Sequence, residues 1–203
     1  MKRPLKLTLG FLLALLLGAL AALTALLVTE GGLRLSLSLA QRFAPGELSW
    51  AAASGRLAGP LQLRDLRYVD ADRRIAVNRL ELEWSPARLL AWRLIVDRLH
   101  LDSVIIQMPS TEDTDDTPIE PGWRLPLEIQ VHDLALTDLS IQRGTAEPVE
   151  LQELRVAASS GRDWVDFETF SLQRAQERIT AQGRLGLGRD SATDLQLTLD
   201  AAP

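Results

Sequence analysis

The sequence predicts one N-terminal transmembrane helix followed by a mostly-β domain with a single short helix. Two observations carry this prediction. The first is a run of uncharged residues, Leu7–Thr29, directly after a short basic N-terminus. The second is an alternation of apolar and polar residues that begins at Glu47 and continues, strand after strand, to the end of the 203-residue chain.

The uncharged run is long enough to cross a bilayer. As a helix it would extend roughly 35 Å at about 1.5 Å per residue, against a hydrocarbon core of about 30 Å. Three basic residues lie within residues 1–6, and Glu30 follows the run. The positive-inside rule therefore places residues 1–6 in the cytoplasm and everything after Glu30 on the other side. The alternative is a signal peptide cut after Ala21, but such apolar regions usually have about 7–15 residues. The length favours a retained anchor.

Residues 30–46 fit two kinds of secondary structure. The alternating positions of a strand are Leu33, Leu35, Leu37 and Leu39. One face of a helix would instead hold Leu33, Leu37, Ala40 and Phe43. Pro45-Gly46 ends the segment in either case. We expect a short amphipathic helix near the membrane surface.

From residue 47 the apolar residues repeat with period two, with one recurring irregularity. Leu61 and Leu63 form one pair, and Leu66 begins the next pair three residues later. The same step of three separates Val77 from Leu80. Such a step predicts a β-bulge or a bend, after which the side chains return to the same face of the sheet.

One helix signal interrupts the predicted strands. Ser85-Pro86 indicates a helix of about two turns that continues through Trp92, with the serine as N-cap and the proline at the first position. Strands resume at Leu94. The segment Ser110–Gly122 carries five acidic residues and two prolines, which is typical of a solvated loop. Further strands are expected over Leu125–Gln142, Val149–Ala157, Phe167–Arg174, Arg178–Leu187 and Asp194–Asp200.

A repeat with an offset of 35 residues links two of these strands. Ile95–Gln107 and Gln130–Gln142 are identical at five positions: Val96/Val131, Leu99/Leu134, Leu101/Leu136, Ile106/Ile141 and Gln107/Gln142. Repeats of this size are typical of extended arrays in which each unit stacks on its neighbours. The alternative is a chance agreement between two amphipathic strands.

Composition excludes several functions. The chain has no cysteine, so disulfides, thiolate catalysis and thiolate metal sites are absent. The first 29 residues carry +3, so the remainder of a chain with net charge −5 carries −8. An acidic body repels phosphate backbones, and we expect no nucleic-acid binding.

No motif predicts catalysis or a cofactor. His100 and His132 fall at polar positions of strands, where a solvated histidine is the simpler expectation. Ser159-Ser160-Gly161 indicates a turn and lacks the surroundings of a nucleophile elbow. Gly183, Gly186 and Gly188 lack the dinucleotide-binding order and more simply relieve crowding in a strand. The acidic segment also lacks calcium-loop spacing. We therefore expect no enzyme, no catalytic residue, no cofactor and no metal.

The strands offer more apolar surface than the few helices can cover. Two arrangements would account for it. In a closed sandwich a second sheet covers the apolar face, whereas in a folded-over open sheet the inner faces stay apart and line a groove. Periodicity alone does not separate the two.

The sequence resembles the N-terminal part of the TamB family, within the wider AsmA-like group. The matching features follow the family's order: the basic N-terminus and anchor, Arg42-Phe43-Ala44-Pro45-Gly46, Ser54-Gly55-Arg56-Leu57-Ala58-Gly59-Pro60-Leu61, Leu63-Arg64-Asp65-Leu66-Arg67-Tyr68, Leu80–Trp84, Leu89-Leu90, and Val96 with Leu99 and Leu101. Each motif is low in specificity, but the ordered set is specific and spans nearly the whole chain. Family members are far longer, so the chain corresponds to the inner-membrane end.

The resemblance implies an open, folded-over antiparallel sheet, called a β-groove or β-taco, over residues 47–203. It implies a single-pass protein of the bacterial inner membrane with its body in the periplasm. The function it implies is conduction of phospholipid acyl chains toward the outer membrane. The implied partner is the outer-membrane barrel protein TamA, through a C-terminal region absent here. The alternative function is an anchored scaffold for assembly of outer-membrane proteins.

The candidate groove residues are those in the apolar phase of the first strands, and about ten strands would give a groove of roughly 50 Å. They are Leu61, Leu63, Leu66, Tyr68, Ile75, Val77, Leu80, Leu82, Trp84, Val96, Leu99, Leu101, Val104, Ile106, Val131, Leu134, Leu136, Leu139 and Ile141.

Overall fold

The computed structural model of the chain describes residues 15, 17–18, 21–22, 24–109, 125–187 and 193–201. The predicted anchor, Leu7–Thr29, lies mostly outside these residues, and the predicted acidic loop, Ser110–Gly122, lies entirely outside them. In the described part of the chain, no helix is both long enough and apolar enough to cross a membrane.

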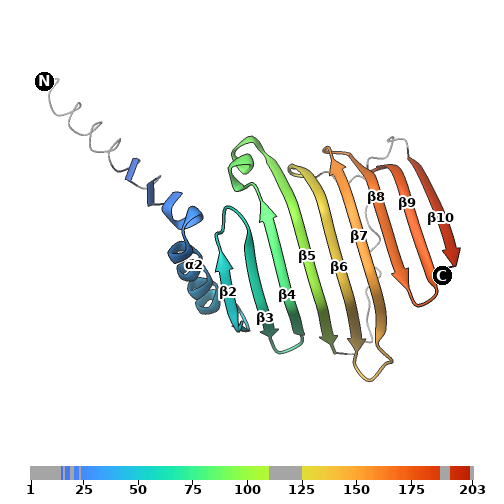
Figure 1. The fold of residues 1–203 in the computed structure, drawn as a ribbon, viewed down its shortest axis with the longest axis horizontal. Helices are drawn as coiled ribbons and strands as arrows, with labels where there is room; N and C mark the ends of the chain where they lie inside the picture. Colours follow the sequence, from blue (N-terminus) through green and yellow to red (C-terminus); the bar gives the residue numbers. More distant parts are fainter. Residues whose placement is uncertain are drawn as a thin grey trace, which may run out of the picture.

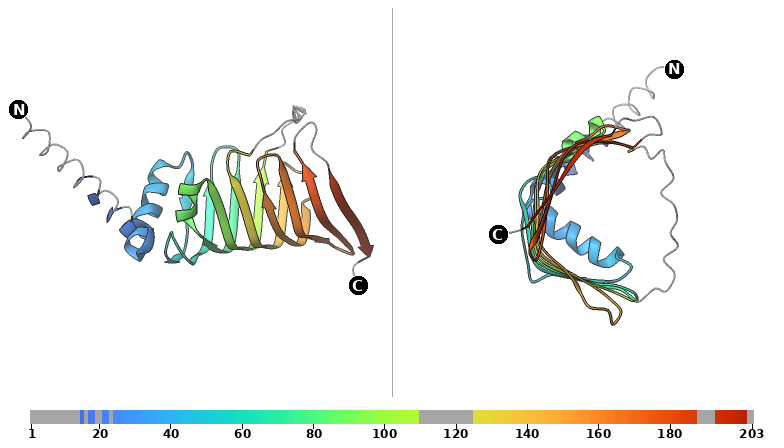
Figure 2. Two further views of the ribbon diagram at one scale, coloured as in Figure 1. Left: turned by 90° about the horizontal axis from the view of Figure 1, so that it is seen from above. Right: turned by 90° about the vertical axis from the view of Figure 1, so that its right-hand side faces the viewer.

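Every described strand belongs to one sheet that forms a single curved layer (Figure 1). Its strand order is β1-β3-β4-β5-β6-β7-β8-β9-β10, and β2 pairs with β3 beside β1. Seen along the row of strands, the sheet curves like a C, and α2 lies inside the curve (Figure 2). The elements are α2 (Glu30–Phe43), β1 (Glu47–Ser49), β2 (Ala52–Gly55), β3 (Leu61–Val69), β4 (Arg74–Trp84), η1 (Pro86–Ala91), β5 (Arg93–Met108), β6 (Glu128–Arg143), β7 (Val149–Ser160), β8 (Trp164–Arg174), β9 (Glu177–Gly186) and β10 (Asp194–Ala201).

Segment 30–46 contains the expected helix, α2, and the sequence supplies a start signal and a stop signal for it. The Thr29 hydroxyl accepts a hydrogen bond from the backbone N–H of Gly32 at 3.0 Å, which caps the first turn. The helix ends before Pro45, which disfavours helical conformation at Ala44. The predicted apolar face is only partly right. Leu33 is buried, whereas Phe43 is 77% exposed.

The helix expected after Ser85 is a short 3₁₀ helix, η1. The Ser85 side chain does not cap it, and the Ser85 carbonyl accepts a hydrogen bond from the N–H of Arg88 instead. Six residues are too few for an α-helix to gain from i→i−4 bonds, and 3₁₀ turns are common connectors of this length. Trp92, predicted inside the helix, follows its end in a left-handed conformation.

The sheet is antiparallel, as expected, except where β5 and β6 run parallel. This parallel pair is the 35-residue repeat. Val96 faces Val131, Leu101 faces Leu136, and every other registered pair of β5 and β6 has the same offset. The repeat therefore has a structural meaning, because the two copies are neighbouring strands in register.

The predicted bend is a line that crosses five strands. The registers skip one residue in each of β3 to β7 at this line, and these residues are Asp65, Asn78, Ser103, Asp138 and Gln152. Three of them have positive φ angles near 50°: Asp65, Ser103 and Asp138. Aspartate and asparagine adopt this left-handed conformation more readily than other non-glycine residues. The apolar side chains return to one face on both sides of the line, as the three-residue step predicted.

The strands of the C-terminal half match the predictions closely, with one correction. Ser159 and Ser160 were predicted in a turn but belong to the end of β7. The Ser160 side chain is buried and its hydroxyl accepts a hydrogen bond from the backbone N–H of Ile129 at 3.0 Å. The hydroxyl thus ties β7 to β6, which explains how a polar residue completes the strand.

Gly183 confirms the expectation of a crowded strand position. Its φ angle is 118°, and a Cβ there would collide with the carbonyl oxygen of Asp194 in β10. Glycine is therefore required for β9 and β10 to approach each other. Gly188 lies outside the described residues.

Candidate functional site

One face of the sheet carries rows of apolar side chains that run across the strands. In register, neighbouring strands place these residues opposite one another, so their side chains point to the same side. We call this side the ladder face. Its longest row is Leu63, Leu80, Leu101, Leu136, Leu154, Leu172, Ile179 and Leu199. The row beside it is Leu61, Leu82, Leu99, Leu134, Val156, Phe170, Ala181 and Leu197.

Three further rows complete the ladder face. Beyond the bend lies Leu66, Val77, Val104, Leu139 and Leu151, followed by Tyr68, Ile75, Ile106, Ile141 and Val149. At the opposite rim lies Trp84, Val96, Val131, Ala158 and Phe167. All the groove candidates predicted from the sequence therefore fall in these rows, and the structure brings them together on one face.

The sequence analysis missed the continuation of the rows into the later strands. These residues are Leu151, Leu154, Val156, Phe167, Phe170, Leu172, Ile179, Leu195, Leu197 and Leu199. The same period-two alternation marks β7 to β10, so the signal was present in the sequence. The rows extend to the last described strand.

Helix α2 covers the ladder face at its first strands. Leu33 of α2 is 1% exposed and packs with Leu61 and Leu63 of β3. Leu37 and Leu80 add to this cluster. Burying a leucine side chain stabilises a fold by about 1.5–3 kcal/mol, so the contact holds α2 firmly against the sheet. The predicted groove residues Leu61 and Leu63 thus belong to a closed core rather than to an open surface.

Beyond this cluster, no described element covers the ladder face. The contacts between described elements join neighbouring strands, α2 with β1 and β2, and η1 with β5. Leu101, Leu136, Leu154 and Leu172 are accordingly half-buried rather than buried. A closed sandwich, one of the two arrangements that periodicity allowed, does not occur in the described part of the chain. The ladder face of β5 to β10 is an apolar surface that no described element covers, although Val104 and Ala181 within it are buried.

Two rim contacts fix the edges of the ladder face. The indole N–H of Trp84 donates to the carbonyl oxygen of Leu57 at 2.7 Å. At the other rim the Tyr68 hydroxyl donates to Asp70 at 3.2 Å. Burial and this hydrogen bond raise the pKa of Tyr68. The backbone N–H of Asp72 donates to the Asp70 carboxylate and lowers the pKa of Asp70.

The two histidines lie on the outer face, in exposed pairs that bridge the parallel strands. His100 Nε2 lies 2.7 Å from Asp133 Oδ2, and His132 Nδ1 lies 3.2 Å from Asp97 Oδ1. Exposed pairs of this kind contribute at most about 1 kcal/mol. They join β5 to β6 on the side away from the ladder face. Among the described residues no group of three or more His, Asp or Glu side chains could hold a metal ion.

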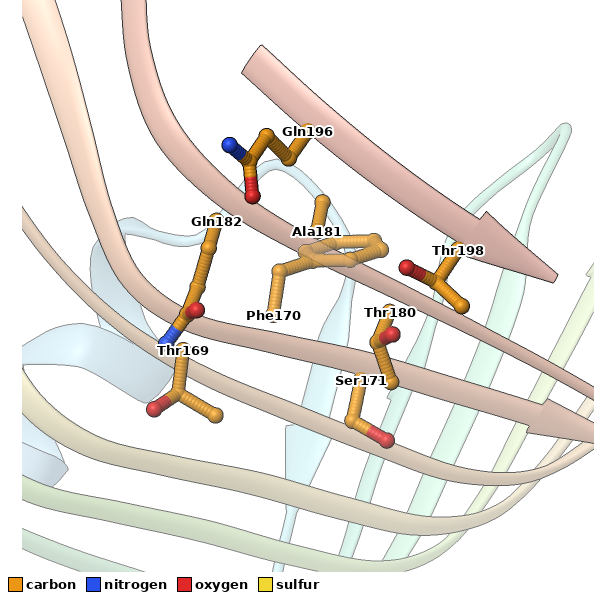
Figure 3. Close-up of a pocket in the computed structure, with 8 residues that line it drawn as sticks. All are labelled: Thr169, Phe170, Ser171, Thr180, Ala181, Gln182, Gln196 and Thr198. Atoms are coloured by element: carbon orange, nitrogen blue, oxygen red, sulfur yellow. The ribbon is translucent and has the colours of Figure 1, made fainter. Parts of the chain in front are cut away.

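A hollow of about 290 Å³ lies over β8, β9 and β10 (Figure 3). Hydroxyls and amides supply its polar groups, from Thr169, Ser171, Thr180, Gln182, Gln196 and Thr198. The Gln182 amide already donates to the carbonyl oxygen of Glu168 at 2.9 Å. None of these groups titrates near neutral pH, so the hollow offers no acid, base or activated nucleophile.

Comparison with known proteins identifies one family. The family model described as "TamB, N-terminal domain" matches residues 19–122, just over half of the chain. A search of curated proteins finds no match. The matched residues include α2, the closed core beneath it and β5, the first strand of the open ladder face.

Proposed function

The chain belongs to the TamB family, whose N-terminal domain it contains, and from this premise we propose that its ladder face conducts phospholipid acyl chains. In this proposal the chain is a non-enzymatic component of the translocation and assembly module. It is anchored in the inner membrane by residues 7–29, and its sheet lies in the periplasm. The lipids move along the rows toward the outer membrane.

The open ladder face is the observation that carries this proposal. Each CH₂ group removed from water contributes about 0.8 kcal/mol, so an acyl chain can slide only along an unbroken apolar path. The two central rows supply such a path from strand to strand. No polar side chain interrupts the longest row.

The dimensions suit acyl chains. From β5, the first strand beyond the core under α2, to β10 there are five strand spacings of about 4.8 Å, which give an open path of roughly 24 Å. This is shorter than the 50 Å expected from the sequence, because β1 and β2 share one edge of β3 and because the core under α2 includes residues of β3 and β4. The hydrocarbon core of a bilayer is about 30 Å thick and contains two layers of acyl chains. The described open path therefore has room for one extended acyl chain.

The closed end defines where lipid can reach the path. Leu33 and Leu37 fill the ladder face over β3, so acyl chains do not pass beneath α2 while it stays packed. Lipid would join the path beyond α2, from β5 onward, and would move toward β10.

A second candidate function rests on the edge formed by β10. Among the described strands β10 has a neighbour on one side only, and Leu197 and Leu199 are exposed. An extended segment of a client protein could add to such an edge as a further strand. This is the assembly-scaffold alternative, in which the outer-membrane barrel TamA receives the client.

Photo-crosslinking in cells separates the two functions. A photoreactive amino acid at Leu101 or Leu136 lies on the ladder face, and its matched control at His100 or Thr137 lies on the outer face of the same strand. The lipid conduit predicts phospholipid captured at the two leucine positions and not at the controls. Equal labelling of both faces, or no lipid at either, would overturn it. Client protein captured at Leu199 without lipid at Leu136 would favour the scaffold.

A further inference from the structure

The tip of η1 exposes apolar side chains that the fold does not use. We define the η1 tip as Arg88, Leu89, Leu90 and Trp92. Leu90 is 90% exposed and Trp92 is 71% exposed, and η1 contains no buried residue. Single exposed apolar residues are ordinary, but a leucine pair beside an exposed tryptophan forms a contiguous apolar projection that needs a partner.

The backbone holds the η1 tip in place. Pro86 fixes the first turn, and the Trp92 N–H closes the last turn by donating to the carbonyl of Leu89 at 3.0 Å. On either side, the Ser85 N–H donates to the backbone carbonyl of Ile95, and the Glu128 N–H donates to the backbone carbonyl of Trp92, both at 3.0 Å. Trp92 has a φ angle of 57°, which is rare for a bulky side chain. The indole is therefore held outward by a backbone that is bonded on both sides.

The η1 tip lies at the end of the sheet where the predicted anchor joins the body. The carbonyl of Leu27, near the end of that anchor, accepts a hydrogen bond from the Ala58 N–H at 2.7 Å. The preceding residue, Leu57, accepts the indole hydrogen bond of Trp84, two residues before Pro86. Figure 1 shows η1, the green helix, at the rim of the sheet between β4 and β5.

The chemistry of the η1 tip fits a phospholipid surface. Tryptophan and leucine beside arginine are typical of segments that rest in the membrane interface, where the indole and the guanidinium stay near the headgroups. No ion pair within the described residues involves Arg88. The body as a whole carries −8 and is repelled by anionic lipids, so a local basic residue such as Arg88 favours contact at this point.

We propose that the η1 tip inserts into the surface of an anionic phospholipid membrane and docks the closed end of the sheet on the bilayer. This inference rests on the proposed function, which places the chain at the inner membrane. Docking would hold the open rows, which begin beside η1, close to the lipids they are proposed to receive.

The test uses the full chain in vesicles of phosphatidylethanolamine and phosphatidylglycerol. The chain has no cysteine, so single cysteines can carry a fluorophore at Leu90, at the exposed outer-face control Ile105, and at Leu136. Lipids with brominated acyl chains should quench the label at residue 90 and leave residue 105 unquenched. An unquenched label at residue 90, or a photo-crosslink from residue 90 to protein instead of lipid, would overturn the inference.

Two further arms separate this inference from the proposed function. The variant Arg88→Gln should weaken insertion of the η1 tip about fivefold in anionic vesicles, as expected for one basic residue at a charged surface. An unchanged quench would contradict the role of arginine. Quenching at residue 90 without lipid at residue 136 would leave docking intact and refute the conduit. Lipid at residue 136 without quenching at residue 90 would refute docking alone.

Discussion

A charge placed at two positions of the same row distinguishes an open face from a closed core. Leu63 of β3 and Leu136 of β6 belong to the longest row of the ladder face, and β4 and β5 lie between them. Leu63 is 6% exposed beneath α2, whereas Leu136 is half-buried with no described element above it. The substitutions Leu63→Asp and Leu136→Asp therefore make the same chemical change in two different surroundings.

The expected losses of stability differ by several kcal/mol. At Leu63 the change removes about 2–5 kcal/mol of leucine packing and buries a carboxyl group without a partner, which adds a few kcal/mol more. That sum is comparable to the total stability of a typical domain, about 5–15 kcal/mol. At Leu136 the carboxylate reaches water. The loss is then about 1 kcal/mol for a half-buried leucine and up to about 1 kcal/mol for strand propensity.

Urea unfolding of the full chain in detergent, followed by tryptophan fluorescence, measures both free energies. We expect Leu136→Asp to unfold cooperatively with a loss of about 1–2 kcal/mol, and Leu63→Asp to lose at least about 4 kcal/mol. The uncharged controls Leu63→Asn and Leu136→Asn separate the charge from the lost volume. A loss of 4 kcal/mol or more at Leu136 would mean that its face is a dry core, and the reasoning would be refuted.

Three other predictions follow from particular residues. At the bend, Asp138→Val should destabilise the sheet by about 1–2 kcal/mol, because a β-branched residue resists a φ angle of 52°. The control Asp138→Gly should be near neutral. Equal urea midpoints for the valine and glycine variants would contradict this reasoning. Deleting Ser110–Gly122 should abolish the parallel pairing of β5 and β6, because the seven Cα–Cα steps then left between the two strands reach only about 25 Å, whereas each strand is roughly 50 Å long. Inserting seven glycine and serine residues into the same connection should cost less than about 1 kcal/mol. A deletion variant with an unchanged melting temperature would refute the parallel pairing. By NMR, the Asp70 carboxylate should titrate below its ordinary pKa of 3.8, because the Asp72 N–H and the Tyr68 hydroxyl donate hydrogen bonds to it. These hydrogen bonds stabilise the turn at pH values above 3.8, and the stabilisation is lost as the pH falls through the lower pKa of the folded state. A titration midpoint at or above 3.8 would contradict the hydrogen bonds.

The ladder face could be predicted from the sequence because its signal is strong and local. Side chains two residues apart in a strand share a face, so Leu99 and Leu101 had to lie together whatever their partners. The step of three at Leu63 and Leu66 marked the bend for the same reason. Even the pairing of β5 with β6 left a trace, since identical residues 35 apart are opposite each other in register.

The direction of that pairing could not be predicted, because alternation is the same in parallel and antiparallel strands. The role of α2 was also hidden. Its leucines occupy both sides of the helix, and only the position of β3 decides that Leu33 packs while Leu35 is exposed. Ser85-Pro86 marked the right start for a helix, but the short distance to β5 left room only for a 3₁₀ turn. In each case the missing information lies in contacts between distant segments.

Protection of the ladder face by lipid is the most direct test of the account. Single cysteines at Leu101, Leu136 and Leu154 sample the open row, and one at Leu63 samples the row beneath α2. A small polar maleimide should label the first three rapidly in delipidated protein and slowly after phospholipid is added. It should label Leu63→Cys slowly in both cases, and an outer-face cysteine at Thr137 rapidly in both. Labelling of the open row that does not change with phospholipid would contradict the conduit.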